Sequence, residues 1–229
     1  MNAKILEIFR SIQGEGKYAG CLQVFVRFFE CNMHCVWCDT PASIGDGKRG
    51  YKGMGLKDAL RQVDALYENA RCVSITGGEP LLQKDFLKSF CHALRQGGKK
   101  IYLDTNGTLP GALAEIIKDI DIIAMDIKLP SSTRQKAFWA QHKEFLKVAQ
   151  HKEVFVKTVI SLNTKAEEVL KAAKLVAAVD PEILFILQPN YPDMKKGTIE
   201  QCAGYQKSCA KILKDVRILP QVHKFMKLR

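Results

Sequence analysis

The chain has 229 residues, of which 47% are hydrophobic and 26% are charged. These fractions are ordinary for a globular protein, so they exclude disorder as the default and allow a sizeable core. The 35 Lys and Arg residues exceed the 24 Asp and Glu residues, which gives a formal net charge of +11. That charge suits acidic small molecules as partners. We do not expect nucleic-acid binding, because the sequence has no arginine-rich arm and no recognised nucleic-acid motif.

No apolar run is long enough to span a bilayer, and the first residues, MNAKILEIFRSIQGEG, lack the apolar core and cleavage site of a signal peptide. We therefore expect a cytoplasmic protein without membrane partners. Reducing compartments disfavour disulfides, so the eight cysteines are expected to be free for metal or redox roles or to serve as small core residues.

Segments of strand length alternate with helical patterns along most of the chain. The predicted strands are 23–29, 72–76, 100–104, 120–127, 154–160, 183–188 and 216–220. The predicted helices are 56–70, 84–96, 111–118, 135–150, 164–179 and 199–213. The strands are nearly continuous in hydrophobicity and rich in β-branched residues, which is typical of parallel strands covered on both faces.

Repeated β-helix-β units predict an α/β fold with right-handed crossovers. About six such units are too few for a closed eight-stranded barrel, so we expect a partial (βα)6-type barrel with parallel strands in one domain, 1–229. The one long irregular stretch is 41–55, which holds five glycines. Loops of this length are usually functional, and this one is predicted to be a lid or a wall of the site.

Polar or glycine-rich segments follow the predicted strands. Because ligands of parallel α/β sheets gather at the carboxyl ends of the strands, these loops should converge on one site. In chain order they are CNMHCVWCDT (31–40), TGGEP (76–80), DTNGT (104–108), MDIK (125–128) and QPNY (188–191).

Three cysteines, Cys31, Cys35 and Cys38, lie within eight positions and can wrap a metal centre. Structural zinc takes four protein ligands, and His34 or a distant cysteine could supply the fourth. Iron–sulfur clusters are ordinarily held by four cysteines, so three would leave one iron open to bind a substrate. The residue types alone leave both alternatives open. The other five cysteines are expected to be small core residues.

The C-x3-C-x2-C spacing, with Trp37 before the third cysteine, resembles the signature of the radical S-adenosylmethionine (SAM) superfamily. Gly77, Gly78, Glu79 and Pro80 are similar to its GGEP motif. The resemblance implies a [4Fe–4S] cluster held by Cys31, Cys35 and Cys38, with SAM on the open iron. It also implies that Gly78 and the Glu79 carboxylate meet the amino group of SAM.

Motifs along the whole chain resemble one family of this superfamily, the 7-carboxy-7-deazaguanine synthases. They are EIFRSIQGEG (7–16), VRF (26–28), CDT (38–40), DTNGT (104–108), QP (188–189) and QVHK (221–224). The resemblance implies conversion of 6-carboxy-5,6,7,8-tetrahydropterin to 7-carboxy-7-deazaguanine with loss of ammonia, in deazapurine or queuosine-type biosynthesis. It also implies a Mg²⁺ ion ligated by Thr40.

The same resemblance assigns residues to two ligands. The pterin would be bound by the N-terminal segment 7–16 and the C-terminal tail 216–229, through Ile12, Gln13, Gly14, Glu15, Arg27, Thr76 and Arg229. SAM would be bound by Trp37, Cys38, Asp39, Gly78, Glu79, Asp104, Asn106, Asp126, Lys128, Gln188 and Pro189.

Two alternatives stay open at this point. A glycyl-radical activase of the same superfamily would use the same cysteine spacing, and a zinc-stabilised nucleic-acid-binding module would fit the cysteines and the charge. The superfamily resemblance further implies a flavodoxin- or ferredoxin-type electron donor as partner. A homodimer is a further assembly that the sequence admits.

Overall fold

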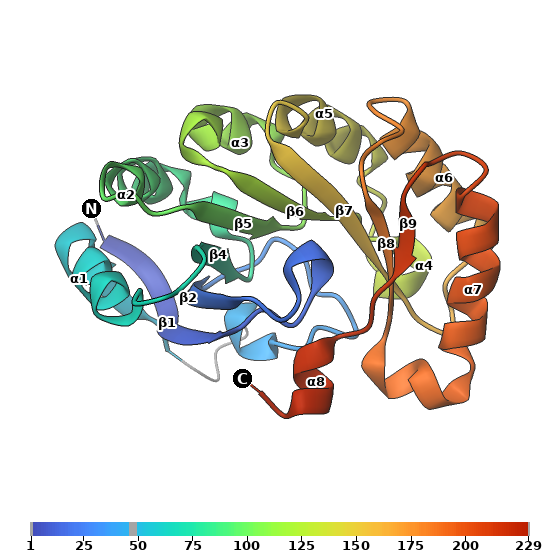
Figure 1. Ribbon diagram of the computed structural model, residues 1–229, viewed down its shortest axis with the longest axis horizontal. Helices are drawn as coiled ribbons and strands as arrows, with labels where there is room; N and C mark the ends of the chain where they lie inside the picture. Colours follow the sequence, from blue (N-terminus) through green and yellow to red (C-terminus); the bar gives the residue numbers. More distant parts are fainter. Residues whose placement is uncertain (1, 46–49, 229) are drawn as a thin grey trace.

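The computed structural model describes residues 2–45 and 50–228, which contain one sheet in the strand order β3-β1-β2-β4-β5-β6-β7-β8-β9 (Figure 1). From β2 onward all neighbours are parallel, whereas β1 is antiparallel to both β2 and β3. The strands are β1 (Asn2–Ile12), β2 (Leu22–Phe28), β3 (Lys52–Gly55), β4 (Val73–Gly77), β5 (Ile101–Thr105), β6 (Ile122–Asp126), β7 (Glu153–Ile160), β8 (Phe185–Pro189) and β9 (Val216–Ile218).

Helices follow the parallel strands and form a layer around the outside of the curved sheet, from α1 to α7 (Figure 1). The α-helices are α1 (Leu56–Leu66), α2 (Lys84–Gln96), α3 (Pro110–Ile116), α4 (Pro130–Thr133), α5 (Trp139–Ala149), α6 (Ala166–Ala177), α7 (Thr198–Cys209) and α8 (Val222–Met226). The 3₁₀ helices are η1 (Gly16–Tyr18), η2 (Pro41–Ser43), η3 (Pro80–Gln83), η4 (Ile117–Asp119) and η5 (Tyr191–Lys196). The expected α/β partial barrel is confirmed.

The sequence patterns missed two strands, β1 and β3. The first is 11 residues long and pairs with β2 on one side and β3 on the other. The second has the sequence KGMG and lies inside the stretch 41–55 that was predicted to be irregular. Two glycines in four residues disfavour a strand locally, so it is the pairing with β1 that extends this segment. The predicted lid therefore divides into η2, β3 and a part, 46–49, that lies outside the described residues.

The main core lies between the sheet and the outer helices, and α2 shows how the sequence builds it. Its buried side chains recur at helical spacing and so form one face toward the sheet. Burying each large apolar side chain contributes about 1.5–3 kcal/mol. These residues are Phe86, Leu87, Phe90, Cys91 and Leu94.

A second, smaller apolar cluster includes Tyr18, Tyr102 and Phe155. Its strand residues come from the first halves of β5 to β8, away from the carboxyl ends of those strands. It therefore underlies the carboxyl-terminal edge and leaves that edge open for ligands.

Strand register places polar side chains side by side at this edge. Arg27 on β2 lies between Glu7 of β1 and Thr76 of β4. Asp126 at the end of β6 pairs with Lys157 on β7.

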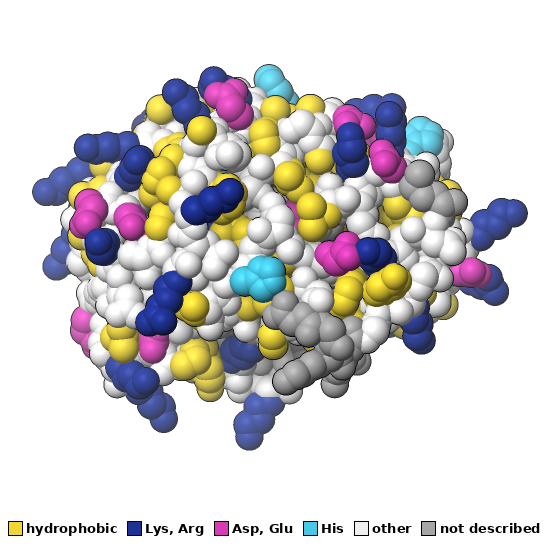
Figure 2. All heavy atoms as spheres, turned by 180° about the vertical axis from the view of Figure 1, so that it is seen from behind, with side chains coloured by type: hydrophobic (Ala, Val, Ile, Leu, Met, Phe, Trp, Pro, Cys, Tyr) yellow, Lys and Arg dark blue, Asp and Glu magenta, His cyan; other side chains and the backbone are white. Residues whose placement is uncertain are grey.

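None of the described helices combines the length and the apolar character that crossing a membrane requires. The face shown in Figure 2 carries Lys and Arg side chains that are spread among apolar and acidic ones and form no single basic patch. The Lys and Arg side chains of this face are thus dispersed.

Candidate active site

A cavity at the carboxyl ends of the strands collects most of the residues that the sequence singled out. Arg229 lies outside the described residues, and Glu79 and Pro189 do not line this cavity. The predicted residues that line it are Ile12, Gln13, Gly14, Glu15, Arg27, Cys31, Cys35, Trp37, Cys38, Asp39, Thr40, Thr76, Gly78, Asp104, Asn106, Asp126, Lys128 and Gln188.

Cys31, Cys35 and Cys38 are free, partly exposed thiols on one wall of the cavity. Their loop turns where the Cys38 N–H donates to the Cys35 carbonyl over 3.0 Å. Burial raises the pKa of the Cys31 thiol to about 11 and also raises the pKa of the other two thiols. Thiolates form readily in such surroundings only when a cation compensates their charge, so three of them on one loop fit a metal centre.

The outer side of this loop is fixed to α4. The Val36 N–H donates to the Thr133 carbonyl over 3.3 Å, and the Trp37 indole N–H donates to Ser132 Oγ over 2.9 Å. The Ser132 hydroxyl in turn donates to the Val159 carbonyl on β7. The cysteine loop is therefore positioned by the sheet as well as by its own turn. His34, the alternative zinc ligand, is exposed and does not line the cavity.

The glycines of GGEP lie where two backbone segments approach each other closely. Gly77 has φ 139°, and a Cβ atom there would lie 2.1 Å from the Phe28 carbonyl oxygen. A Cβ atom on Gly78 would lie 2.1 Å from the Glu30 carbonyl oxygen. Both glycines therefore allow the end of β4 to approach the chain that leads into the cysteine loop.

Glu79 is fully buried behind the cavity wall. Its carboxylate accepts hydrogen bonds from the backbone N–H groups of Leu81 and Asn106 and from the Thr105 hydroxyl. These hydrogen bonds lower the pKa of Glu79, but burial raises it more, to about 7. Glu79 does not line the cavity, and its contact with SAM stays a prediction. Glu79 orders the segment that carries Asn106 into the cavity.

The opposite wall is built from charges contributed by distant parts of the chain. Lys157 of β7 contacts Glu15 over 2.5 Å and Asp104 over 3.3 Å, and its side chain is only 6% exposed. Burial alone would raise the pKa of Glu15, but the charge of Lys157 together with the hydrogen bonds from Lys157 and Gln221 outweighs burial, so the pKa is lowered. Sequence reasoning missed Lys157. The available signal was a lysine in the middle of an otherwise apolar strand.

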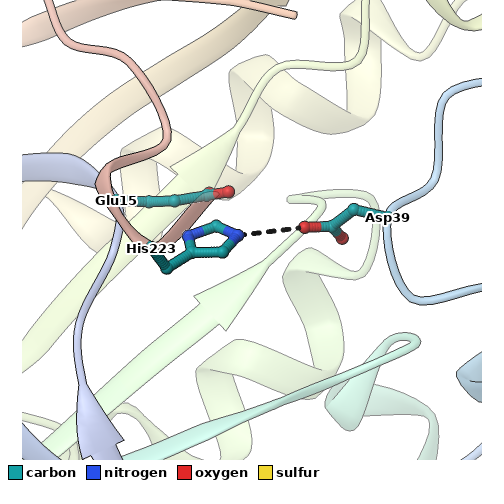
Figure 3. A group of neighbouring side chains, drawn as sticks. All are labelled: Glu15, Asp39 and His223. Atoms are coloured by element: carbon teal, nitrogen blue, oxygen red, sulfur yellow. Dashed lines mark ion pairs between the residues drawn. The ribbon is translucent and has the colours of Figure 1, made fainter. Parts of the chain in front are cut away.

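The C-terminal segment reaches the same carboxylates, as Figure 3 shows for Glu15, Asp39 and His223. Gln221 Nε2 donates to Glu15 Oε1 over 2.7 Å. His223 Nε2 lies 3.6 Å and Lys224 Nζ 3.7 Å from Asp39 Oδ2. Burial raises the pKa of Asp39, but the contacts with His223 and the charge of Lys224 together outweigh burial and lower the pKa, so the group stays ionised.

Glu15, Asp39 and His223 each offer a ligand atom within 4.8 Å of the other two, the spacing of a cation site. Both carboxylates already face cations or donors of the protein, however. Glu15 faces Lys157 and Gln221, and Asp39 faces Lys224. The arrangement therefore serves as a satisfied charge network that exposes carboxylate oxygens to the cavity.

Gly14 is a position where the absence of a side chain is required. A Cβ atom there would lie 2.1 Å from His223 Nδ1. The Gly14 carbonyl also accepts a hydrogen bond from the Val222 N–H over 2.8 Å. The end of β1 and the start of α8 are thereby held together across the cavity mouth.

Arg27 and Thr40 join the two walls. Arg27 Nε donates to Glu7 Oε1 over 2.9 Å, and its Nη1 lies 3.4 Å from Thr40 Oγ1. The Thr40 hydroxyl donates to Asp39 Oδ1 over 3.2 Å. Arg27 keeps further N–H groups for an anion in the cavity, and Thr40 presents an oxygen beside a carboxylate.

Two cavity residues have acceptor atoms without a partner among the described residues, Asp126 Oδ1 and Gln188 Oε1. Buried polar atoms are normally paired, so unpartnered ones at a cavity wall indicate where a polar ligand binds. Lys128 contacts the other oxygen of Asp126 over 2.6 Å. The donor and acceptor set on this wall suits a zwitterionic ligand that carries both ammonium and carboxylate groups.

Comparison with known proteins agrees with this geometry. Residues 26–176 match the radical SAM superfamily. The chain is 36% identical to the 7-carboxy-7-deazaguanine synthase of Geobacter sulfurreducens over 98% of this chain and 97% of the relative. It is 33% identical to the enzyme of that name from Archaeoglobus fulgidus over 100% of both chains. The chain belongs to the 7-carboxy-7-deazaguanine synthase family.

Among solved structures, QueE from Escherichia coli has a similar fold, with a TM-score of 0.66, 21% sequence identity and coverage of 97% of this chain and 95% of that one. Membership of the 7-carboxy-7-deazaguanine synthase family confirms the resemblance seen in the sequence and does not favour the activase or the zinc module. It implies a [4Fe–4S] cluster and SAM, and the three free thiols and the unpartnered acceptors on one cavity fit both groups.

Proposed function

We propose that this chain converts 6-carboxy-5,6,7,8-tetrahydropterin to 7-carboxy-7-deazaguanine with loss of ammonia. The supporting observation is a single cavity that has three thiols on one wall and, on the other, an arginine together with ionised carboxylates. The thiol wall can hold the centre that radical chemistry requires. The other wall can bind a substrate that has both an anionic group and N–H donors.

The substrate can be oriented by its two unlike ends. Its carboxylate pairs with the Arg27 guanidinium, which offers two parallel N–H groups to such a group. Its amino-pyrimidinone edge donates to Glu15, which Lys157 keeps ionised and directed into the cavity. Ile12, Gln13, Gly14 and Thr76 complete this wall. Holding the substrate beside the reacting group lowers the entropic part of the barrier.

SAM would lie against the cysteine wall. When bound, the cluster and SAM supply the radical that removes hydrogen from the substrate. The chain contributes Asp126 and Gln188 as acceptors for polar groups of SAM, with Asn106 and Lys128 beside them. The proposed SAM contacts further include Trp37, Cys38, Asp39, Gly78 and Asp104. Glu79 also acts through Asn106, while its own contact with SAM and the contacts of Pro189 and Arg229 stay predictions.

Thr40 is proposed to ligate Mg²⁺ together with oxygens of the substrate. Its hydroxyl oxygen lines the cavity between Arg27 and Asp39, and hard cations prefer such oxygen donors. Thr40→Val keeps the shape and removes the ligand, so it should lower the stimulation of turnover by Mg²⁺ and leave the cluster content unchanged.

The decisive experiment is an anaerobic assay of the reconstituted protein with SAM, a reductant and the carboxytetrahydropterin, with and without Mg²⁺. We expect 7-carboxy-7-deazaguanine and ammonia in equal amounts. Cleavage of SAM without formation of this product under any metal condition would contradict the proposed reaction. It would still agree with membership of the radical SAM superfamily. Arg27→Lys should raise KM for the pterin, since a point charge cannot make two parallel bonds, whereas Arg10→Lys on the exposed side of β1 should not.

We further propose that the whole chain, 1–229, acts as one domain in which 7–16 and 216–229 form the substrate wall. A flavodoxin- or ferredoxin-type protein is the proposed electron donor. Reconstitution of turnover with each donor in place of a chemical reductant tests that partner. Light scattering tests the homodimer, and fractionation of cells tests the cytoplasmic location.

A further inference from the structure

Lys128 lies beside the cysteine loop, and its charge can act on this loop as well as on a bound ligand. It follows β6, its side chain is 15% exposed, and it lines the cavity. Its ammonium lies 4.6 Å from the centre of the Trp37 ring, the residue directly before Cys38. The same ammonium contacts Asp126 Oδ2 over 2.6 Å.

The position of this ammonium is fixed on both sides. The Trp37 ring is held by its hydrogen bond to Ser132, which is itself bonded to the Val159 carbonyl. The backbone before Lys128 is held to β7, because the Ile127 N–H donates to the Lys157 carbonyl over 2.9 Å. These contacts and the ion pair with Asp126 place the ammonium beside the cysteine loop.

Lys128 shares its cavity with the three cysteines. It lines that cavity together with Cys31, Cys35 and Cys38, and its ammonium lies over the ring of the residue directly before Cys38. Its positive charge is therefore held, largely buried, beside the loop that would hold the cluster.

We propose that Lys128 raises the reduction potential of the cluster that Cys31, Cys35 and Cys38 hold, independently of any contact that it makes with SAM. Reduction by an external one-electron donor adds a negative charge to a centre that three thiolates already make anionic. A nearby buried ammonium stabilises the reduced form more than the oxidised form, because attraction grows with the charge and is screened little inside the protein.

The test is a redox titration of the reconstituted protein without SAM, followed by absorbance and by electron paramagnetic resonance of the reduced cluster. At a fixed solution potential, Lys128→Met should lower the ratio of reduced to oxidised cluster about tenfold. This corresponds to a reduction potential that is lower by ~59 mV for a one-electron couple. Lys128→Arg keeps the charge and should stay near the wild-type potential. Asp126→Asn removes the opposing charge and should shift the potential upward.

Iron and sulfide content establish that each variant carries the cluster, and Lys84→Met, which breaks an exposed pair with Glu115, is the matched control. If Lys128→Met fails to load, Lys128→Gln, which removes the charge and keeps a polar side chain, decides the question by the same downward shift. Unchanged potentials in both variants without SAM would overturn the proposal. The result does not depend on product formation, so a shifted potential in a protein that makes no deazaguanine would refute only the proposed reaction.

Discussion

The two walls of the cavity are built in different ways. The cysteine wall consists of one short loop, fixed by backbone hydrogen bonds and by a tryptophan anchored on α4. The substrate wall is assembled from distant segments of the chain, and Gln221 and Glu15, which are 206 residues apart, are in direct contact. Local backbone geometry positions the first wall, whereas paired charges position the second.

This difference indicates which changes each wall tolerates. A turn that backbone bonds hold depends on a few specific residues, such as the cysteines and the glycines that allow close approach. A wall held by buried charges depends on every partner, because removing one leaves another unpaired in a poorly solvated place. Substitutions at the two walls and behind them should separate these two modes of construction.

Cys35→Ala should remove the cluster and with it all turnover, because two thiols cannot replace three on a loop of this size. Cys91→Ala is the control, since this cysteine is fully buried in the core face of α2. It should retain iron. Both results come from iron and sulfide analysis and from absorbance after anaerobic reconstitution. A Cys91 variant without cluster, beside a Cys35 variant that retains it, would show that the cavity wall is not the metal site.

Lys157→Met should destabilise the fold by about 3–5 kcal/mol, because it leaves the Glu15 and Asp104 carboxylates buried without their cation. The free energy of unfolding from urea denaturation measures this loss. Lys84→Met breaks an exposed pair and should leave that free energy unchanged within error. Equal effects of the two substitutions would remove the distinction between the buried network and surface pairs.

Glu79→Gln should change how stability depends on pH. Burial raises the pKa of Glu79 from 4.5 to about 7, so the folded state favours the protonated form. The stability that this group contributes is complete below pH 4.5 and is lost as the pH rises to about 7, on the order of 3 kcal/mol. The difference in unfolding free energy between wild type and variant should fall over that interval. Parallel profiles of unfolding free energy against pH for wild type and variant would refute this prediction. Glu144→Gln, at an exposed position of α5, is the control.

Gly14→Ala should cost about 1–3 kcal/mol and raise KM for the pterin, since the new Cβ atom would overlap the His223 ring and displace the start of α8. Gly111→Ala is the matched control, because a Cβ atom at that position in α3 meets nothing within 4 Å. Thermal unfolding and steady-state kinetics give the two readouts. An unchanged KM would show that α8 does not help to form the substrate wall.

The same contrast explains how much the sequence could predict. The strand predicted at 154–160 corresponds to β7 (Glu153–Ile160), and the helix predicted at 84–96 to α2, because both have strong apolar patterns. The helix predicted at 135–150 begins later, at Trp139, since the chain first forms α4 (Pro130–Thr133) and a turn. Strand β3 was missed because only its pairing with β1 makes it a strand.

The cysteine wall was predicted residue by residue, since its spacing is local and chemically specific. The substrate wall was predicted only where a family motif marked it. Lys157 was missed, and His223 was given no role, because nothing within a few positions of either one shows that a carboxylate from another part of the chain will lie beside it. Such partners become apparent only once the strands are placed in order.

The contact between the end of β1 and the start of α8 has a consequence for how the protein is made. During synthesis the three cysteines and the first parallel strands emerge early, yet Glu15 and Asp39 wait for Gln221 and His223, which are translated after β9. Closing so long a loop is slow relative to forming local structure. A ribosome-bound chain therefore acquires its means of holding a metal centre well before it acquires a complete substrate wall.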